Sequence, residues 1–88
     1  MVEKIFVVKN KLGLHARPAA MLVQTAGKFK SQVKIIKDGQ VVDGKSIMGL
    51  MTLAAAAGTN LKITIDGPDE QEAMDAMTSL IDGGFGEE

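Results

Sequence analysis

The Asp-Gly dipeptide at residues 38–39 stands between two short segments that both have the pattern of a β-strand. In residues 32–37 the apolar side chains of Val33 and Ile35 alternate with polar ones, and residues 40–42 follow the dipeptide directly. Two strand-like segments joined by Asp-Gly are the strongest short-range signal for a β-hairpin. The chain is therefore predicted to contain an antiparallel pair of strands, and its fold must include a sheet built on that pair.

Two further strands and three helices follow from the same kind of pattern. Residues 5–8 form a short apolar segment between charged neighbours, and residues 61–65 alternate apolar and polar side chains. Helical spacing runs from residue 16 to about 28, a short helix is predicted from 47 to about 53, and a last helix begins at residues 68–70. The predicted order is β-α-β-β-α-β-α, which favours a two-layer α/β sandwich with an antiparallel sheet.

The predicted core consists of the apolar faces of these elements. With three Phe and no Trp or Tyr, it must be built mainly from Val, Ile, Leu, Met and Ala. A chain of 88 residues suffices for one such core, so residues 1–88 are predicted to form a single domain. The residues predicted to face this core from the helices are Pro18, Leu22, Val23, Ala26, Phe29, Leu50, Leu53, Ala73, Met74, Met77, Leu80 and Ile81.

Composition argues against several classes of function. A net charge of −1, from 10 basic and 11 acidic residues, argues against a protein that binds the phosphate backbone of nucleic acids. The absence of cysteine excludes disulfides and thiolate metal sites, and a single histidine excludes multi-histidine zinc sites. We therefore expect no metal and no cofactor. The longest uncharged segment, residues 46–61, is too short for a membrane span, and no targeting signal is visible, so we expect a cytoplasmic protein without membrane insertion.

Residues 13–19, with the sequence Gly-Leu-His-Ala-Arg-Pro-Ala, contain the strongest candidates for chemistry. His15 stands where a turn passes into the first long helix, and Pro18 suits the first turn because it lacks an N–H group. The first amides of a helix have no acceptor within it and favour an anion, so Ala16 and Arg17 are candidate phosphate-binding amides. The Arg17 guanidinium can bind phosphate through two hydrogen bonds. His15 is then a candidate nucleophile that would hold a phosphoryl group.

Taken singly, these residues have simpler interpretations. A histidine before a helix is more often a cap or a surface residue, an arginine is more often a solvated charge, and a proline in a first turn is a helix starter. A purely structural protein would leave their convergence unexplained. A self-sufficient hydrolase or kinase would need a further base, a metal cluster or a nucleotide loop, and the sequence contains no Walker-type glycine motif. We therefore expect no turnover without partner enzymes.

Two segments of the chain resemble a known family. Residues 13–19 resemble the active-centre motif of HPr, the histidine-containing phosphocarrier family of the bacterial sugar phosphotransferase system. Residues 45–51, Lys-Ser-Ile-Met-Gly-Leu-Met, resemble the regulatory-serine segment of HPr proteins from organisms that have an HPr kinase. The resemblance covers essentially the whole chain. It implies that His15 accepts phosphate on Nδ1 from phospho-enzyme I, itself charged by phosphoenolpyruvate, and donates it to IIA domains of sugar permeases, with Arg17 nearby.

The same resemblance implies an HPr-like, open-faced sandwich, in which an antiparallel sheet of strand order 1-4-2-3 carries three helices on one face. It also implies that partners dock on an exposed apolar patch beside the active centre. Methionine suits such a patch because its side chain adapts to several partners. We expect the chain to act as a monomer. The residues that we assign to the partner interface are Ala20, Ile47, Met48 and Met51.

Ser46 has both a structural and a regulatory interpretation. From the residues alone, a serine before Ile47 is a natural N-cap of the short helix. By resemblance, an HPr kinase/phosphorylase would phosphorylate Ser46, which would add roughly −1.5 to −2 charges and hinder the loading of His15. In some bacteria of this family, the phosphoserine form also binds a catabolite-control transcription regulator.

Asp43 departs from the family pattern, which commonly has a neutral residue at this position. A negative charge near Ser46 makes recognition by the kinase less certain than carriage on His15. One alternative is a binding module that works through Ser46 alone, although relatives of that kind lack the histidine. Another alternative is a nitrogen-related or other specialised phosphorelay through His15, and the Ser46 segment favours the sugar pathway over it.

Overall fold

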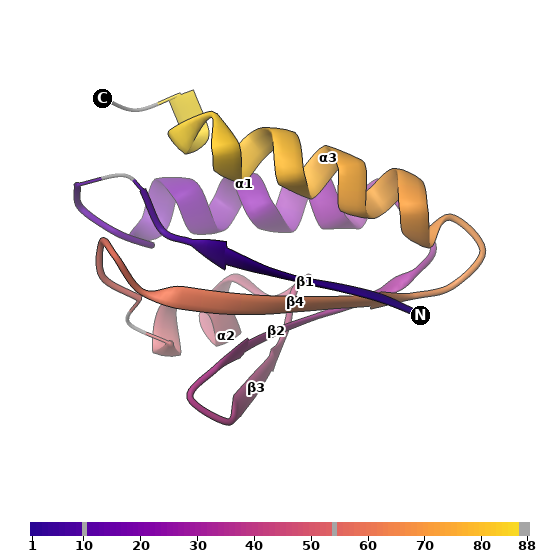
Figure 1. The fold of residues 1–88 in the computed structure, drawn as a ribbon, viewed down its shortest axis with the longest axis horizontal. Coiled ribbons are helices and arrows are strands. Elements are labelled where there is room, and N and C mark those ends of the chain that lie inside the picture. The colour runs from indigo at the N-terminus through magenta and orange to yellow at the C-terminus, as the bar shows by residue number, and fades with distance from the viewer. Residues whose placement is uncertain (10, 54, 87–88) are drawn as a thin grey trace.

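The fold consists of four strands and three α-helices in the predicted order, followed by a short 3₁₀ turn (Figure 1). The structure is a computed structural model that describes residues 1–9, 11–53 and 55–86. The elements are β1 (Val2–Val7), α1 (Ala16–Gly27), β2 (Gln32–Lys37), β3 (Gln40–Asp43), α2 (Ile47–Thr52), β4 (Asn60–Asp66), α3 (Glu70–Asp82) and η1 (Gly84–Gly86).

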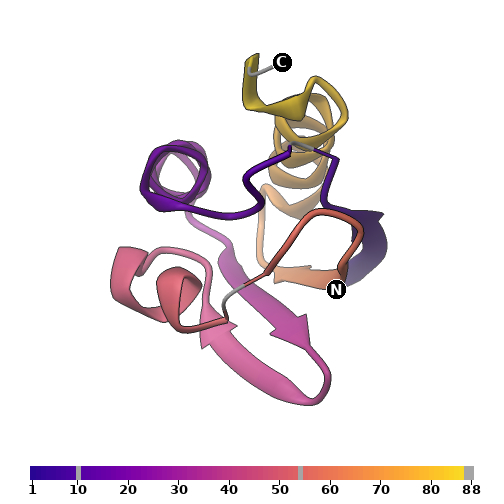
Figure 2. The same cartoon turned by 90° about the vertical axis from the view of Figure 1, so that its left-hand side faces the viewer.

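The strands form one antiparallel sheet in the order β1-β4-β2-β3. The last strand, β4, therefore lies inside the sheet between β1 and β2. The helices lie on one face of the sheet and leave the opposite face open (Figure 2). Both the open-faced sandwich and its strand order agree with what the resemblance to the HPr family implies.

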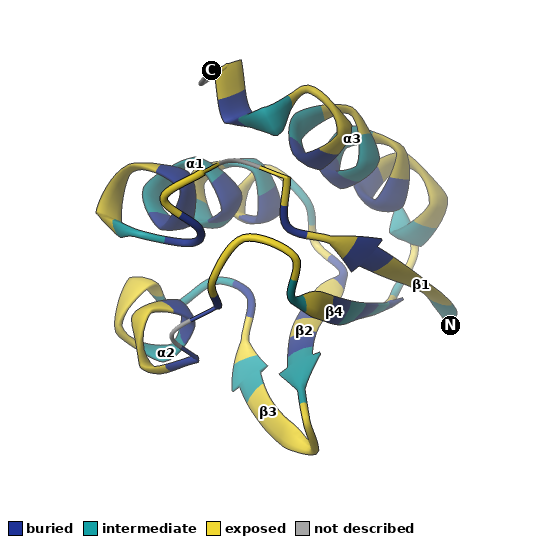
Figure 3. Ribbon diagram, turned by 60° about the vertical axis from the view of Figure 1, so that its left-hand side comes forward, coloured by how far each residue is buried: buried dark blue, intermediate teal, exposed yellow. Residues whose placement is uncertain are grey.

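The core lies between the helices and the covered face of the sheet, and Figure 3 marks buried residues in dark blue on the helices and on the strands. In β4, every second residue points toward the helices, and Leu61, Ile63 and Ile65 are buried as their alternation predicts. Three residues that were predicted to face the core are only partly buried and pack against its margin, namely Val23, Phe29 and Leu80. The helices bury Pro18, Ala19, Leu22, Ala26, Leu50, Ala73, Met74, Met77 and Ile81.

Strand β1 begins earlier than the sequence predicts. The prediction was residues 5–8, because Glu3 and Lys4 interrupt the apolar pattern. In the structure Glu3 lies opposite Thr64 of β4, and its carboxylate forms an ion pair with the Nζ atom of Lys62 at 3.0 Å. Pairing with a neighbouring strand therefore extends β1 through charged positions whose side chains remain exposed.

The hairpin between β2 and β3 confirms the prediction made from Asp-Gly. Asp38 has a φ angle of 49° and Gly39 has a φ angle of 83°. Positive φ at both central residues is the geometry of a type I′ turn, whose twist matches that of the strands it joins. The turn places Lys37 opposite Gln40 and thereby fixes the register of β2 and β3.

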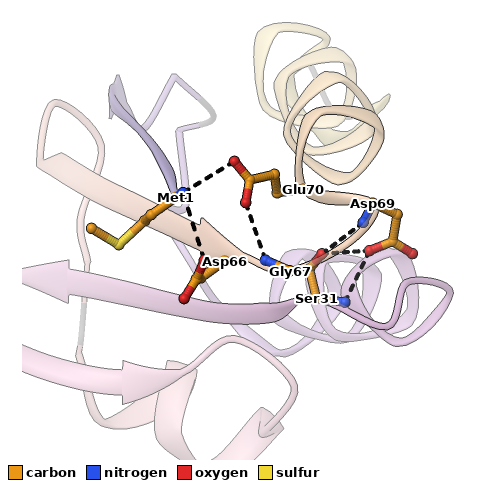
Figure 4. A network of polar contacts seen from close by, with 6 residues as sticks. All are labelled: Met1, Ser31, Asp66, Gly67, Asp69 and Glu70. Carbon is orange, nitrogen blue, oxygen red and sulfur yellow. Dashed lines mark hydrogen bonds and ion pairs between the residues drawn. The ribbon is translucent and has the colours of Figure 1, made fainter.

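A carboxylate joins the loop between α1 and β2 to the beginning of α3 (Figure 4). Asp69 accepts hydrogen bonds from the amides of Lys30 and Ser31, each at 2.9 Å, and from the hydroxyl of Ser31. Asp69 occupies the N-cap position of α3, but its side chain bonds to this loop instead of capping the helix. The sequence predicted the helix start and not this long-range contact.

Candidate functional site

The loop that precedes α1 is anchored to the loop that follows α2. Gly13 and Leu14 are both buried, and the Leu14 amide donates a hydrogen bond to the carbonyl oxygen of Ala55 at 2.7 Å. Gly13 has a φ angle of 70°, and a Cβ atom at this position would clash with the same carbonyl oxygen. Only glycine fits this approach without strain, so Gly13 and Leu14 set the position from which His15 enters the helix.

His15 occupies the N-cap position of α1, as its place in the sequence predicts. Its backbone is extended, with φ −88° and ψ −168°, and its side chain makes no cap hydrogen bond. The His15 amide donates to the carbonyl oxygen of Gly13 at 3.1 Å, and its carbonyl oxygen accepts from the amide of Ala19 at 3.1 Å. The residue is half-buried, so it is neither enclosed in the core nor fully in solvent.

The next three residues form the first turn of α1. Ala16 and Arg17 provide the first two amides of the helix, where no helical carbonyl lies behind them to accept a hydrogen bond. Pro18 is the third helical residue and is buried, so it fixes the first turn against the core. The prediction that Pro18 lies in the first turn is confirmed. The positive end of the helix dipole is thus next to His15.

Arg17 contributes the nearest cationic side chain along the chain. It is exposed, and within the described part of the chain its guanidinium forms no ion pair. An exposed guanidinium that is not occupied by a carboxylate can bind a phosphate through two hydrogen bonds. His15, the two amides and Arg17 therefore combine a nucleophilic ring with groups that favour a bound anion.

Ser46 is the N-cap of α2, as predicted. Its Oγ atom accepts a hydrogen bond from the amide of Gly49 at 3.1 Å. The turn before it is built by Asp43, whose carboxylate accepts from the Lys45 amide at 2.9 Å and whose carbonyl oxygen accepts from the Ser46 amide at 3.1 Å. Asp43 thus has a structural role here, namely to shape the turn that presents Ser46. The Nζ atom of Lys45 bonds to the carbonyl oxygen of Phe29 at 2.9 Å and ties this turn to the end of α1.

Helix α2 has one apolar side in the core and another in solvent. Leu50 and, just after the helix, Leu53 are buried, which confirms their predicted place in the core. Three large apolar side chains are exposed and together define what we call the α2 apolar surface. Its members are Ile47, 42% exposed, Met48, 76% exposed, and Met51, 43% exposed. Ala20, the fourth predicted interface residue, is half-buried on α1, and α1 packs against α2.

The described residues contain neither a cluster of metal ligands nor a helix that could span a membrane. Among residues 1–9, 11–53 and 55–86, no group of three or more His, Cys, Asp or Glu side chains could hold a metal ion. No helix in these ranges is long and apolar enough to cross a membrane. A cavity of about 550 Å³ lies between β1 and α3, and its lining includes Lys4, Met74 and Asp75 but no residue of the His15 segment.

Sequence reasoning missed the residues that hold the His15 loop in place. Gly13 enters the sequence-based prediction only as the first residue of the segment 13–19, and no role is predicted for Ala55. A signal was present for Gly13, because a glycine just before a candidate site often marks a close approach of two backbones. No sequence signal identifies Ala55, because its contribution is a backbone carbonyl oxygen.

Comparison with known proteins agrees with this geometry. The model of the family described as the PTS HPr component phosphorylation site matches residues 2–82. The chain belongs to the HPr family. A phosphocarrier protein HPr from Cupriavidus necator is 55% identical and aligns over 99% of this chain and 98% of its own length. The HPr-like protein Crh from Halalkalibacterium halodurans is 52% identical over 93% of this chain and 98% of its own length.

A solved HPr structure has nearly the same fold. The crystal structure of HPr-C-His from Thermoanaerobacter tengcongensis superposes with a TM-score of 0.96 at 51% identity, covering 100% of this chain and 99% of the other. HPr proteins are phosphocarriers of the phosphotransferase system and not enzymes, and the chain falls into that class.

Proposed function

We propose that the chain carries a phosphoryl group on His15, accepting it from phospho-enzyme I and passing it to IIA domains of sugar permeases. The observation that carries this proposal is the position of His15, which stands at the N-terminus of α1 with the exposed Arg17 side chain two residues further on. This arrangement supplies a nucleophile and an anion-binding environment in one segment. The HPr family supports the direction and the partners of the transfer.

The transfer is a substitution at phosphorus. The unprotonated nitrogen of the neutral His15 imidazole, Nδ1 by resemblance to the family, forms a bond to phosphorus while the bond to the donor breaks and its electron pair stays with the donor. The single N–H proton is on the other ring nitrogen, where it exchanges with the medium. The amides of Ala16 and Arg17 and the Arg17 guanidinium then stabilise the phosphoryl dianion. Because this site is open to solvent on one side, the group remains accessible to the next acceptor.

Partners would dock on the α2 apolar surface and on Ala20. An exposed apolar patch is a common mark of a protein interface, and Met48 and Met51 adapt to differently shaped partners. Both enzyme I and the IIA domains must approach His15, so one adaptable surface beside it would serve donor and acceptors in turn. The contact between α1 and α2 supports the placement of this surface near the carrier site.

Phosphorylation of Ser46 would regulate phosphoryl transfer through His15. Phosphorylation by an HPr kinase/phosphorylase would place roughly −1.5 to −2 charges at the start of α2, beside the proposed docking surface. Partner surfaces suited to the cationic His15 site would then be repelled, and loading of His15 would slow. A catabolite-control transcription regulator is a further partner for the phosphoserine form. The similarity to Crh, an HPr-like protein, supports a regulatory use of the fold.

In this proposal residues 1–88 act as one cytoplasmic domain and as a monomer. The main alternative is a regulatory binding module that works through Ser46 alone. Because His15, Arg17 and the glycine-anchored loop are all present here, carriage on His15 is favoured.

The proposal is tested by incubating the chain with phosphoenolpyruvate and an active enzyme I and following it by intact mass spectrometry. We expect an acid-labile phosphoryl group that is absent in His15→Ala, present in Ser46→Ala and transferred onward when a IIA domain is added. Failure of the wild-type chain to accept phosphate from a cognate, active enzyme I would contradict carriage. Phosphorylation by ATP and an HPr kinase, absent in Ser46→Ala, would test the regulatory part separately.

A further inference from the structure

The methionines of this chain differ widely in their exposure to solvent. The sequence has six of them. Met74 and Met77 are buried in the core with 5% and 0% of their surface exposed, and Met21 of α1 is partly buried against the core. Met48 is 76% exposed and Met51 is 43% exposed, and both belong to α2. Met1 is also exposed, at 73%, but it lies at the start of the chain beside Asp66 and Glu70 (Figure 4).

The fold keeps the two α2 thioethers in solvent. Met48 and Met51 are three residues apart and therefore lie on the same side of the helix. Burial of Leu50 fixes the opposite side against the core, and the Ser46 cap fixes the first turn. The Nζ atom of Lys37 bonds to the carbonyl oxygen of Leu53 at 2.8 Å, which holds the residue after the helix as well. The helix cannot rotate to bury its methionines without losing these contacts.

We infer that Met48 and Met51 form a reversible oxidation site through which peroxide lowers the affinity of the chain for its phosphotransfer partners. The inference rests on the proposed function, because it needs the α2 apolar surface to be the docking surface. Two of the three residues that define this surface are methionines, so oxidation changes most of it at once. The carrier residue His15 and the buried methionines are not involved.

The chemistry is a two-electron oxygen transfer. A sulfur lone pair of the thioether attacks one oxygen of hydrogen peroxide, an S–O bond forms, the O–O bond breaks, and the departing hydroxide takes up a proton to become water. Sulfur is oxidised to the sulfoxide and the peroxide is reduced. A methionine sulfoxide reductase reverses the change with electrons from a thiol pair, and the sulfoxide oxygen leaves as water.

Oxidation would act on docking rather than on the chemical step. The sulfoxide is polar and stiffer than the thioether, so it removes both the apolar contact and the adaptability that suit methionine to several partners. Loss of one of the few interface side chains that dominate binding weakens it by about fivefold or more. We therefore expect KM for phosphotransfer from enzyme I to rise by about five- to tenfold, while kcat changes by less than about twofold.

The first arm of the test maps the modification. The folded chain is exposed to dilute hydrogen peroxide, and sulfoxide formation at each methionine is followed by peptide mass spectrometry. We expect Met48 to react fastest in α2, Met51 to follow, and Met74 and Met77 to be protected until the chain is unfolded with urea. Protection of Met48 in the folded chain would overturn the inference without any assay of function.

The second arm compares each protein with its own unoxidised form. The ratio of KM after peroxide to KM before it should be about five to ten for the wild-type chain and near one for a Met48→Leu/Met51→Leu variant. Met1 and the partly buried Met21 are present in both proteins, so the variant controls for oxidation at positions other than Met48 and Met51. Treatment of the oxidised wild-type chain with a methionine sulfoxide reductase should restore its initial KM.

Equal ratios in the two proteins, with oxidation of Met48 demonstrated in the wild type, would overturn the inference while leaving the proposed function intact. No phosphotransfer by the unoxidised wild-type chain would instead overturn the proposed function, and the inference with it.

Discussion

The amide of Leu14 donates a hydrogen bond to the carbonyl oxygen of Ala55 at 2.7 Å, and this contact ties the loop that carries His15 to the loop after α2. The buried side chain of Leu14 anchors the same position in the core. Two features that lie far apart in the sequence, the start of α1 and the end of α2, are thereby held in one place. The geometry of the carrier site depends on this backbone contact as much as on its functional side chains.

Substitution of Gly13 by alanine should disturb both stability and phosphotransfer. The new Cβ atom would clash with the carbonyl oxygen of Ala55 and would also require an unfavourable positive φ angle. We expect the free energy of unfolding to fall by about 2–5 kcal/mol, and transfer from enzyme I to slow because His15 is displaced. Urea unfolding and initial transfer rates measure the two effects.

Gly58→Ala is the matched control for this variant. Gly58 also has a positive φ angle, 88°, but a Cβ atom there would meet no atom within 4 Å. The Gly58→Ala substitution should lower the free energy of unfolding by only about 1–2 kcal/mol and leave the transfer rate of the folded protein unchanged. Equal losses of stability and transfer rate in the two variants would contradict this account. They would show that the positive φ angle alone, and not the clash of the new Cβ atom with Ala55, causes the effect of Gly13→Ala.

Arg17→Lys should slow phosphotransfer although it preserves the charge. Lysine cannot bind a phosphate with the two parallel hydrogen bonds that a guanidinium offers. We expect kcat/KM for acceptance from enzyme I to fall by about tenfold, with no change in thermal stability because the side chain is exposed. Lys28→Ala, which removes an exposed cation at the other end of α1, should have little effect. Wild-type kcat/KM in Arg17→Lys would show that a positive charge alone suffices and would contradict a specific role for the guanidinium.

Substitutions of Ser46 should separate capping from regulation. Ser46→Ala removes the acceptor of the Gly49 amide, so the free energy of unfolding should decrease by about 0.5–2 kcal/mol, while His15 is still phosphorylated. Ser46→Asp keeps a good cap but adds a charge, so it should retain stability and accept phosphate from enzyme I about tenfold more slowly. Calorimetry measures the stability of the two variants, and transfer kinetics measure how fast each accepts phosphate from enzyme I. Normal transfer by Ser46→Asp would contradict the regulatory role.

Asp69 should make stability depend on pH. The Ser31 hydroxyl first, and then the amide of Lys30, lower the pKa of the Asp69 carboxyl below its ordinary value of 3.8. A depressed pKa in the folded state means that the stabilisation is present above the unfolded pKa and is lost as pH falls through the folded value. Asp69→Asn should therefore lower Tm at neutral pH, and the difference from wild type should shrink as the pH falls below 3.8.

Asp75→Asn is the control for this comparison. The Asp75 carboxylate is exposed and accepts a hydrogen bond from Gln71 within α3, so Tm should hardly change. A difference between wild type and Asp69→Asn that is independent of pH would contradict the account of the Asp69 carboxylate.

The parts of the fold that could be predicted from the sequence are those with local causes. Asp38 and Gly39 specify their turn through their own backbone preferences, and the spacing of Pro18, Leu22 and Ala26 specifies the buried face of α1. Ser46 was identified as a cap because its partner lies only three residues away. Such features do not depend on the rest of the molecule.

Features with long-range causes could not be predicted in this way. Asp69 and Ser31 are 38 residues apart, and each alone looks like an ordinary helix-cap or loop residue. The early start of β1 depends on pairing with β4, which overrides the charges of Glu3 and Lys4. The strand order and the partners expected for His15 follow from the resemblance to a family, because neither periodicity nor spacing determines them.

The most direct measurement of the central claim uses the fact that His15 is the only histidine in the chain. The chain is labelled with ¹⁵N in histidine alone, charged with phosphoenolpyruvate and enzyme I, and examined by phosphorus and nitrogen NMR. The account predicts one phosphorus signal that is coupled to a labelled ring nitrogen and that disappears when a IIA domain is added. A phosphorus signal without coupling to labelled nitrogen, or no signal at all with an active enzyme I, would contradict it.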